Sequence, residues 1–472
     1  MPHPDRAADR PATFRGVLAN SEYRSIYLAS ALSWFGDAIA RAAVTALVYR
    51  TSSSVVLSAA TFAISYLPWL GIGPVLTALA ERYPLRRVMV VCDIARMVTM
   101  GLVALRGMPL PAMIALLFAT ALLNPPFDAA RSAMMPRVLT GNRYVLAVSL
   151  QLTTAQIALI TGYFAGGALA VYKPHVTLML NALTFGISAL LIGFGVRERA
   201  SAVRADQRKH LLRETAAGFG LVFGHPLLRS IALLVFGTML FTVVPEGLAA
   251  GWAGELAGTA WRNQGWMQGL IMMANPIGWI CGGILVNRLV RPSVRRRLIR
   301  PFALLAPFAL VWAVFRPPVY VVALISAMTG FASGGFLPAA NALFVQSLPA
   351  TFRARAFGVM SSGVQLLQGA AVLATGALAE RFADVPRVVG LWGLGGVGVM
   401  LVVVALWPST ERIRESVETV RVANAATDLE EETIIIPTDQ TIVLSPLVHN
   451  DDTVILPALG NGHSVSGVRI VR

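Results

Sequence analysis

The run Gly167-Ala-Leu-Ala170 recurs as Gly376-Ala-Leu-Ala379, an offset of 209 residues. At this offset, 11 of 44 positions are identical between 127–170 and 336–379. The polar residues that recur are Arg82, Arg86 and Arg87 as Arg291, Arg295 and Arg296, Gln156 as Gln365, and the acidic Asp37 as Glu246. Apolar identities are common in a chain so rich in Ala, Leu and Gly, so the polar pairs decide the interpretation. They indicate a duplicated chain.

The composition excludes an ordinary soluble globule, because 56% of the residues are hydrophobic and only 13% are charged. Apolar stretches of about 20 residues are long enough to cross the hydrocarbon core. They lie at 26–49, 55–80, 88–106, 110–127, 144–172, 174–196, 229–252, 264–287, 298–315, 318–346, 356–379 and 388–407. Backbone groups in lipid must be hydrogen-bonded internally, and these segments are too long for barrel strands. The sequence therefore predicts an all-α integral membrane protein with twelve transmembrane helices.

The repeat divides these helices into two bundles of six. Because six is an even number, both halves enter the membrane in the same direction, and a transport pathway is expected between them. The predicted parts are an N-terminal arm (1–25), a first bundle (26–196), a charged linker (197–228), a second bundle (229–407) and a C-terminal tail (408–472).

The net charge of +15 would suit nucleic acid, but its distribution indicates a membrane topology instead. With the N-terminus inside, 28 of the 39 Lys and Arg residues fall in the cytoplasmic segments and 7 in the opposite loops. This bias is the positive-inside rule, so we expect a multi-pass protein of the cell membrane with both termini cytoplasmic. Anionic lipid headgroups, and not nucleic acid, are the expected partners of the basic loops.

Charged groups at mid-bilayer are costly and usually functional. Asp37 lies halfway along the first span, with Arg41 one turn later on the same helix face, and Glu246 is the repeat equivalent of Asp37. One interpretation is a pair of acids that face a central cavity, one of which takes up a proton when substrate leaves. The other is that Asp37 and Arg41 neutralise each other and fix helix packing. The uncharged candidates for the cavity are Asn124, Gln156, Gln365 and Gln368, although such groups often bind a neighbouring helix instead.

A second charged set lies toward the predicted cytoplasmic ends of the first-half helices. Its members are Glu81, Arg82, Arg86, Arg87, Asp93, Arg96, Asp128 and Arg131. The i, i+3 pairs in this set suit salt bridges that form in one state of a transporter and break in the other. The alternative is that the arginines only anchor the topology.

Over residues 20–407 the chain resembles the Major Facilitator Superfamily, and in particular its branch of enterobactin and macrolide exporters. The matching motifs are Gly36-Asp37, Leu67-Pro68, Gly73-Pro74, Leu79-Ala-Glu-Arg-Tyr-Pro-Leu-Arg-Arg-Val88, Asp93 to Arg96 and Ala130-Arg-Ser-Ala-Met-Met-Pro136. The resemblance implies proton-driven export of an amphipathic small molecule, such as a drug, siderophore or secondary metabolite. It also implies that Glu81, Arg82, Arg86 and Arg87 form a cytoplasmic gate, with Asp128 as a partner. Glu81 and Thr77 depart from the family's usual Asp and Gly.

Other functions stay open at this point. The same fold could serve uptake, or lipid or metabolite transport, and a transport-inactive scaffold or sensor could signal through the tail. An enzyme is not indicated, because none of the six histidines is paired at metal-ligand spacing or lies deep in a span, and the nucleotide-binding Gly-x-x-x-x-Gly-Lys-Ser/Thr motif does not occur. We expect no cofactor and no metal site.

The tail differs from the rest of the chain in composition. Three similar phrases begin at Thr433, Thr441 and Thr453, each preceded by acidic residues. The composition predicts a disordered or weakly structured segment. A second interpretation is that these threonines, once phosphorylated, bind a phosphothreonine-reading partner.

Overall fold

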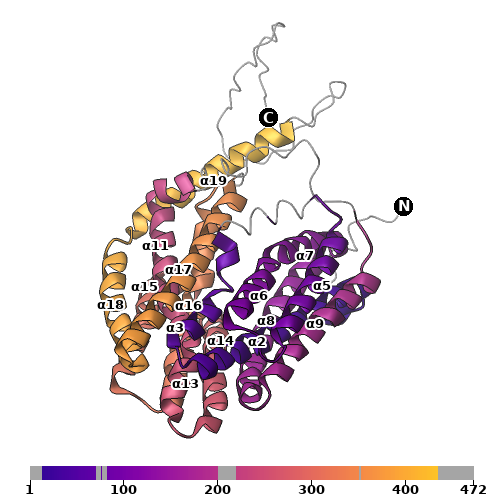
Figure 1. Cartoon of the computed structure of the whole chain (residues 1–472). Helices are drawn as coiled ribbons and strands as arrows, with labels where there is room; N and C mark the ends of the chain where they lie inside the picture. The colour runs from indigo at the N-terminus through magenta and orange to yellow at the C-terminus, as the bar shows by residue number, and fades with distance from the viewer. Residues whose placement is uncertain (1–12, 71–75, 77–81, 200–218, 350–351, 434–472) are drawn as a thin grey trace, which may run out of the picture. The chain divides into compact units, whose positions relative to one another are not determined.

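The computed structural model describes residues 13–70, 76, 82–199, 219–349 and 352–433. Within these ranges the regular elements are helices. The chain forms two compact units, 1–421 and 422–472. The first unit holds the membrane helices (Figure 1).

The first half comprises α1 (Phe14–Leu18), α2 (Ser21–Ser52), α3 (Val55–Ala63), η2 (Leu67–Leu70), α5 (Leu85–Val103), α6 (Leu110–Leu122), α7 (Asn124–Val138), α8 (Gly141–Tyr172) and α9 (Pro174–Gly195). The second half comprises α11 (Pro226–Thr242), α12 (Val244–Gly247), α13 (Ala249–Ala257), η4 (Trp261–Asn263), α14 (Gln264–Leu289), α15 (Pro292–Val311), η5 (Trp312–Phe315), α16 (Val319–Gln346), α17 (Arg353–Phe382) and α18 (Val385–Ala405). The helix α19 (Thr410–Thr433) comes after them.

The helices repeat at the offset found in the sequence. α3 begins at Val55 and α14 at Gln264, and α6 begins at Leu110 and α16 at Val319, each pair 209 residues apart. The element order is thus duplicated, as the polar identities indicated.

Among the described residues, ten helices are long and apolar enough to cross a membrane. They include the ninth predicted span, found at Arg297–Phe315. The predicted spans 55–80 and 88–106 are not among these ten helices, and each has a visible reason. α5 is helical over 19 residues but carries Arg86, Arg87, Asp93 and Arg96. The second predicted span is described only as α3, η2 and Leu76, because 71–75 and 77–81 lie outside the described residues.

Polar caps fix the ends of several helices. The Asn20 side chain accepts the Tyr23 amide at the start of α2, and the Ser54 side chain accepts the Leu57 amide at the start of α3. Between these helices Ser53 takes the left-handed conformation, with φ of 54°. The sharp turn at 53–54 places the end of α2 against the beginning of α3.

Two membrane helices are interrupted just before prolines in the sequence. α6 and α7 meet at Leu123, ahead of Pro125 and Pro126, and α11 and α12 meet at Val243, ahead of Pro245. A break frees backbone carbonyls, which need donors inside a membrane. Asn275 donates to the Thr242 carbonyl at 3.0 Å, and Arg96 donates at 2.8 Å to the Leu123 carbonyl, which also accepts the Phe127 amide at 3.4 Å. Polar side chains therefore gather at the breaks.

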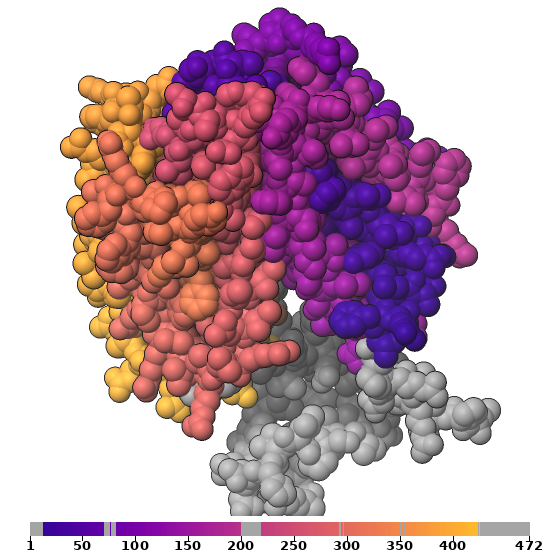
Figure 2. Space-filling view, turned by 90° about the horizontal axis from the view of Figure 1, so that it is seen from below, coloured from indigo at the N-terminus to yellow at the C-terminus, as the bar shows by residue number. Residues whose placement is uncertain are grey.

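The two halves lie side by side. Figure 2 shows the first half in indigo to magenta and the second in salmon to yellow, in contact along a seam. We call the end where α2 begins and α18 ends the terminal side, and the end where α2 ends and α3 begins the opposite side. The seam is formed by α8 with α14 and by α3 with α17.

The tail departs in part from its predicted disorder. Residues 410–433 form α19, whose Glu418 and Arg421 lie 3.9 Å apart at helical spacing. Alternating acidic and basic residues without proline favour a helix here, although the mean composition resembles that of disordered segments. Thr441 and Thr453 lie outside the described residues.

Candidate functional site

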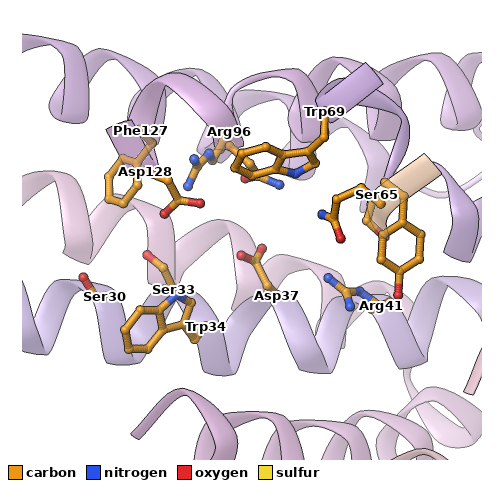
Figure 3. A pocket seen from close by; sticks show the side chains of 13 residues that line it. Ser30, Ser33, Trp34, Asp37, Arg41, Ser65, Trp69, Arg96, Phe127 and Asp128 are labelled. Atoms are coloured by element: carbon orange, nitrogen blue, oxygen red, sulfur yellow. The ribbon is translucent and has the colours of Figure 1, made fainter. Parts of the chain in front are cut away.

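A cavity of about 190 Å³ lies at the middle of α2 (Figure 3). A second space of about 80 Å³ shares Asp37, Arg41, Ser65 and Asn124 with it. The larger cavity is lined by Ser30, Ser33, Trp34, Asp37, Arg41, Ser65, Tyr66, Trp69, Arg96, Asn124, Phe127, Asp128 and Gln365. Gln365 comes from the second half and the others from the first, so both halves contribute to the cavity, as the duplicated sequence suggested.

The helix α2 presents Asp37 to this cavity. Its neighbour Gly36 faces α9, because a Cβ there would collide with Thr184 and Asn181. The close approach of the two helices fixes the rotation of α2, and Figure 3 shows Asp37 pointing into the same space as Asp128. In the described part of the chain, no hydrogen bond or ion pair is formed by the Asp37 carboxylate.

Arg41 binds a different partner from the one its spacing allows. Its guanidinium donates to the Tyr163 hydroxyl of α8 at 3.0 Å and lies 5.6 Å from the centre of the Phe62 ring. Glu246, on the short helix α12 of the second half, interacts electrostatically with Arg41 and with Tyr163. Among the described residues, Asp37 and Arg41 therefore form no direct ion pair. Arg41 instead faces an acid across the boundary between the halves.

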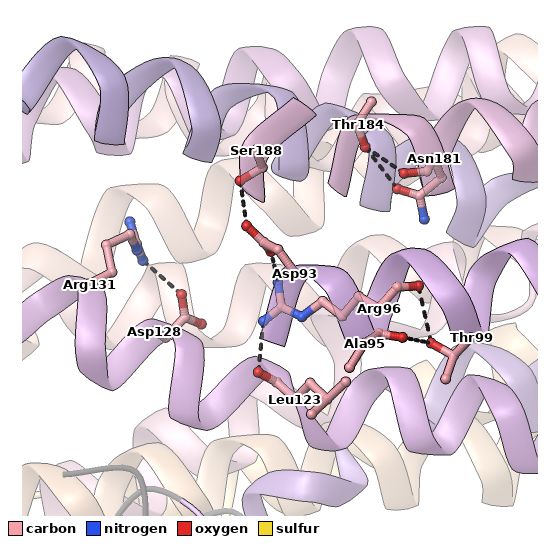
Figure 4. Close-up of polar contacts among 10 residues, drawn as sticks. All are labelled: Asp93, Ala95, Arg96, Thr99, Leu123, Asp128, Arg131, Asn181, Thr184 and Ser188. Carbon is pink, nitrogen blue, oxygen red and sulfur yellow. Dashed lines mark hydrogen bonds and ion pairs between the residues drawn. The ribbon is translucent and has the colours of Figure 1, made fainter. Parts of the chain in front are cut away.

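Asp93 and Arg96 form a buried network beside the cavity (Figure 4). Asp93 is fully buried, accepts a hydrogen bond from Ser188 at 2.6 Å, and lies 3.5 Å from Arg96. The Arg96 guanidinium lies 4.5 Å from the ring centre of Phe127 and 5.4 Å from that of Phe185. Arg96 thus lines the central cavity. The sequence had instead predicted that Arg96 belongs to a gate at the cytoplasmic ends of the helices.

The other predicted gate residues make separate contacts. Arg86 donates to the Gly193 carbonyl at the end of α9, and Arg87 pairs with Glu198 at 2.6 Å. Asp128 and Arg131 pair at 2.9 Å, with Arg131 over the Trp34 ring at 5.0 Å. Arg82 is exposed, and Glu81 lies outside the described residues. The predicted single cluster is therefore divided, because helix packing separates residues that sequence proximity grouped.

Three predicted cavity residues, Glu246, Gln156 and Gln368, do not line the cavity. Gln368 donates to the Met239 sulfur at 3.7 Å within the second half. Gln156, on α8, is half-buried away from the described lining of the cavity. Sequence reasoning also missed Tyr163, Ser30, Ser33 and Trp69, which carry no charge and resemble ordinary span residues. The spacing of Ser30, Ser33 and Asp37 on one helical face was a signal that could have found the serines.

The family model of the Major Facilitator Superfamily matches residues 26–325. The chain belongs to the Major Facilitator Superfamily. A multidrug efflux pump named Tap, from Mycolicibacterium fortuitum, is 25% identical over 247 residues, covering 51% of this chain and 59% of that protein. The match therefore spans less than two thirds of the relative's length.

Solved transporters share the fold. The nucleoside transporter NupG has a TM-score of 0.62 at 12% identity, covering 82% of this chain and 100% of that one. A peptide transporter POT in complex with sulfate has a TM-score of 0.64 at 14% identity, covering 87% and 98%. A bacterial homolog of the human lysosomal transporter Spinster, inward-facing and occupied, has a TM-score of 0.61 at 12% identity, covering 84% and 96%. At these identities the likeness concerns the fold alone.

Proposed function

We propose that this membrane transporter is a secondary active exporter that moves an amphipathic small molecule by alternating access, driven by protons. The observation that carries the proposal is a cavity lined by residues of both duplicated halves, with the acid Asp37 in its wall. Asp37 faces the cavity without a hydrogen-bond partner among the described residues, and Glu246 faces Arg41 across the boundary of the halves. The match to an efflux pump supports export.

Alternating access needs contacts that hold one side closed and can be released. Two side chains of the second half form hydrogen bonds with the first half on the opposite side. Glu380 accepts the amides of Val55 at 2.6 Å and Val56 at 3.2 Å, and Gln268 donates to the Ala42 carbonyl and the Thr45 hydroxyl, both at 2.9 Å. These contacts support a state that is closed on the opposite side. By the distribution of basic residues, the terminal side is the cytoplasmic one.

The two acids take different roles in this proposal. Asp37 is the group that cargo and proton occupy in turn, because its carboxylate is available to the cavity. Glu246, in the second half, couples its protonation to the first half through Arg41 and Tyr163. When Glu246 takes up a proton its attraction for Arg41 falls, and one contact between the halves weakens.

Flux measurements in vesicles test the proposal. The purified full chain is reconstituted, a pH gradient is imposed, and the movement of labelled candidate drugs, siderophores and secondary metabolites is followed. We expect Asp37→Asn to abolish the pH-dependent flux, and Glu246→Gln to lower it by at least about tenfold, which corresponds to about 1.4 kcal/mol. Glu198→Gln is the control, since Glu198 pairs with Arg87 away from the cavity. Undiminished pH-dependent flux in Asp37→Asn would remove proton coupling at this site.

A further inference from the structure

Two serines of α2 behave differently from the other serine and threonine hydroxyls in the body of that helix. Hydroxyls within helices commonly donate to the carbonyl one turn earlier. Ser25, Thr45, Thr51 and Ser52 do so, at 2.7–3.1 Å. The hydroxyls of Ser30 and Ser33 have no hydrogen-bond partner among the described residues, although the two serines are only 2% and 3% exposed. An unpaired buried hydroxyl is unfavourable. Each of the two hydroxyls can therefore form a hydrogen bond with a ligand in the cavity.

Ser30, Ser33 and Asp37 lie on one face of α2 and line the same cavity (Figure 3). The spacings of three and four residues place them in successive turns. The three side chains together offer two hydroxyl oxygens and one carboxylate that the described protein leaves free. A carboxylate accepts hydrogen bonds only, and a hydroxyl can accept them. This set is complementary to a group with several N–H donors and a positive charge.

The cationic side chains of the cavity are already engaged, which argues against an anionic cargo. Arg96 pairs with Asp93, donates to the Leu123 carbonyl and lies against two aromatic rings. Arg41 donates to Tyr163. Asp128 is paired with Arg131. Asp37 is thus the charged group of the cavity that makes no hydrogen bond or ion pair with the described residues, although Arg96 and Arg41 interact with it electrostatically.

The aromatic rings at the cavity set the shape of what can bind. Trp34 and Trp69 line it, and the Trp34 ring is covered by Arg131. The ring of Trp69 can contact the carbon atoms next to a bound nitrogen. A volume of about 190 Å³ suits an amine headgroup with a short apolar arm and is below the ~300–1,000 Å³ of sites that hold a whole drug-sized ligand.

We propose that the Ser30–Ser33–Asp37 face of α2 is an ammonium subsite, which binds the primary or secondary amine of the cargo through its N–H groups. The inference deepens the proposed function and rests on it. It separates protonated amines from quaternary ammonium ions, which carry the same charge but have no N–H donor for the two serines.

Binding of three matched probes to the full chain in detergent tests the subsite. The probes are 4-phenylbutylamine, its N,N,N-trimethylammonium counterpart and the neutral 4-phenylbutanol, measured by calorimetry near neutral pH. We expect the primary amine to bind at least about tenfold more tightly than either of the others. Equal or tighter binding of the trimethylammonium probe, or of the alcohol, would overturn the proposal. This comparison uses the unmodified protein, so no variant has to fold.

Variants then assign the preference to residues. Ser33→Ala and Ser30→Ala should reduce the preference for the primary amine over the trimethylammonium probe, while the preference of charged probes over the alcohol is kept. Asp37→Asn should remove the preference of charged probes over the alcohol. Ser25→Ala is the matched control, because Ser25 lies on the same helix but donates to the Ser21 carbonyl. If both serine variants discriminate like the unmodified chain, the subsite is wrong. Proton coupling is judged separately by the flux test, so either proposal can fail alone.

Discussion

The two seams between the halves occupy equivalent positions in the repeat but differ in chemistry. At the seam of α8 and α14, Gly167 lies against Gly265 and Gly269, and a Cβ on Gly265 would collide with the Gly167 carbonyl. At the seam of α3 and α17, Gly376, the repeat partner of Gly167, lies against Ala59, and Glu380 binds the first amides of α3. The α8–α14 seam is thus a close backbone contact, whereas the α3–α17 seam includes hydrogen bonds to a carboxylate.

The difference indicates unequal roles in a conformational cycle. Small residues let helices approach closely, and such packing tolerates little separation or added volume. A carboxylate at a helix N-terminus is held by charge and hydrogen bonds, which can be lost and remade without repacking. We therefore expect the α8–α14 seam to act as the constant contact and the α3–α17 seam as the releasable one.

The largest expected effect comes from adding a methyl group to the glycine seam. Gly265→Ala places its Cβ against backbone that cannot move aside, and we expect destabilisation of at least about 1–3 kcal/mol and loss of flux. Thermal unfolding of the purified protein measures this. Gly283→Ala on the same helix is the control, since its nearest neighbour is 3.7 Å away. If Gly265→Ala unfolds like the control, the seam is not tightly packed and the contrast between the seams is lost.

The next effect concerns the carboxylate seam. Glu380→Gln should weaken closure of the opposite side by about 1 kcal/mol, because the charge at the start of α3 is lost. The rate at which an impermeant maleimide labels Ser54→Cys measures the opening, in a chain whose exposed Cys281 is replaced by serine. Glu198→Gln on the terminal side is the control. An unchanged labelling rate would show that Glu380 does not hold this side shut.

A smaller effect is expected at Gln268, which bridges the halves from beside the glycine seam. Gln268→Leu and Thr45→Val should be coupled by about 0.6 kcal/mol, the average for hydrogen bonds between membrane helices. A double-mutant cycle on unfolding measures the coupling, and Thr51→Val replaces Thr45→Val as control, because Thr51 donates only within α2. Strictly additive effects would mean that this bond adds nothing to the seam.

The smallest effect is expected at the junction of α17 and α18 on the opposite side. Burial raises the pKa of Asp384, but hydrogen bonds from Arg316 and the Arg387 amide outweigh burial and hold the pKa below its ordinary value of 3.8. A lowered pKa stabilises the fold above the ordinary value, and the gain is lost as pH falls through the folded-state pKa. Asp384→Asn should therefore lower the unfolding midpoint slightly at neutral pH and have no effect in acid. A difference that grows in acid would contradict this sign.

Much of the fold was predictable because membrane helices are encoded locally. Length and apolar composition located the spans, ten of which the described residues show as helices long and apolar enough to cross a membrane. The interruptions at Leu123 and Val243 were not predicted, although prolines follow both positions in the sequence. Asp37, Arg41, Asn124 and Gln365 were predicted to share a cavity, and the structure brings them together. Buried ionisable groups are rare in membranes, so the few that occur are conspicuous in a sequence.

The partners of these residues could not be predicted. Arg41 has Asp37 one turn away, yet it binds Tyr163, which lies 122 positions later on α8. Arg96 was placed in a gate because its neighbours in sequence are charged, but α5 turns it toward the Leu123 carbonyl at the junction of α6 and α7. Spacing fixes which residues share a helix face, but it does not fix which helix that face meets.

The sequence alone located the apolar segments, the duplication and the charged residues within those segments, since each depends on composition and spacing along one chain. The tertiary structure decided which charges are matched, which hydroxyls of α2 stay free, and which seam is backbone and which is carboxylate. The reason is physical: hydrogen bonds and ion pairs between helices depend on rotation and distance, which are set only when the helices pack against one another.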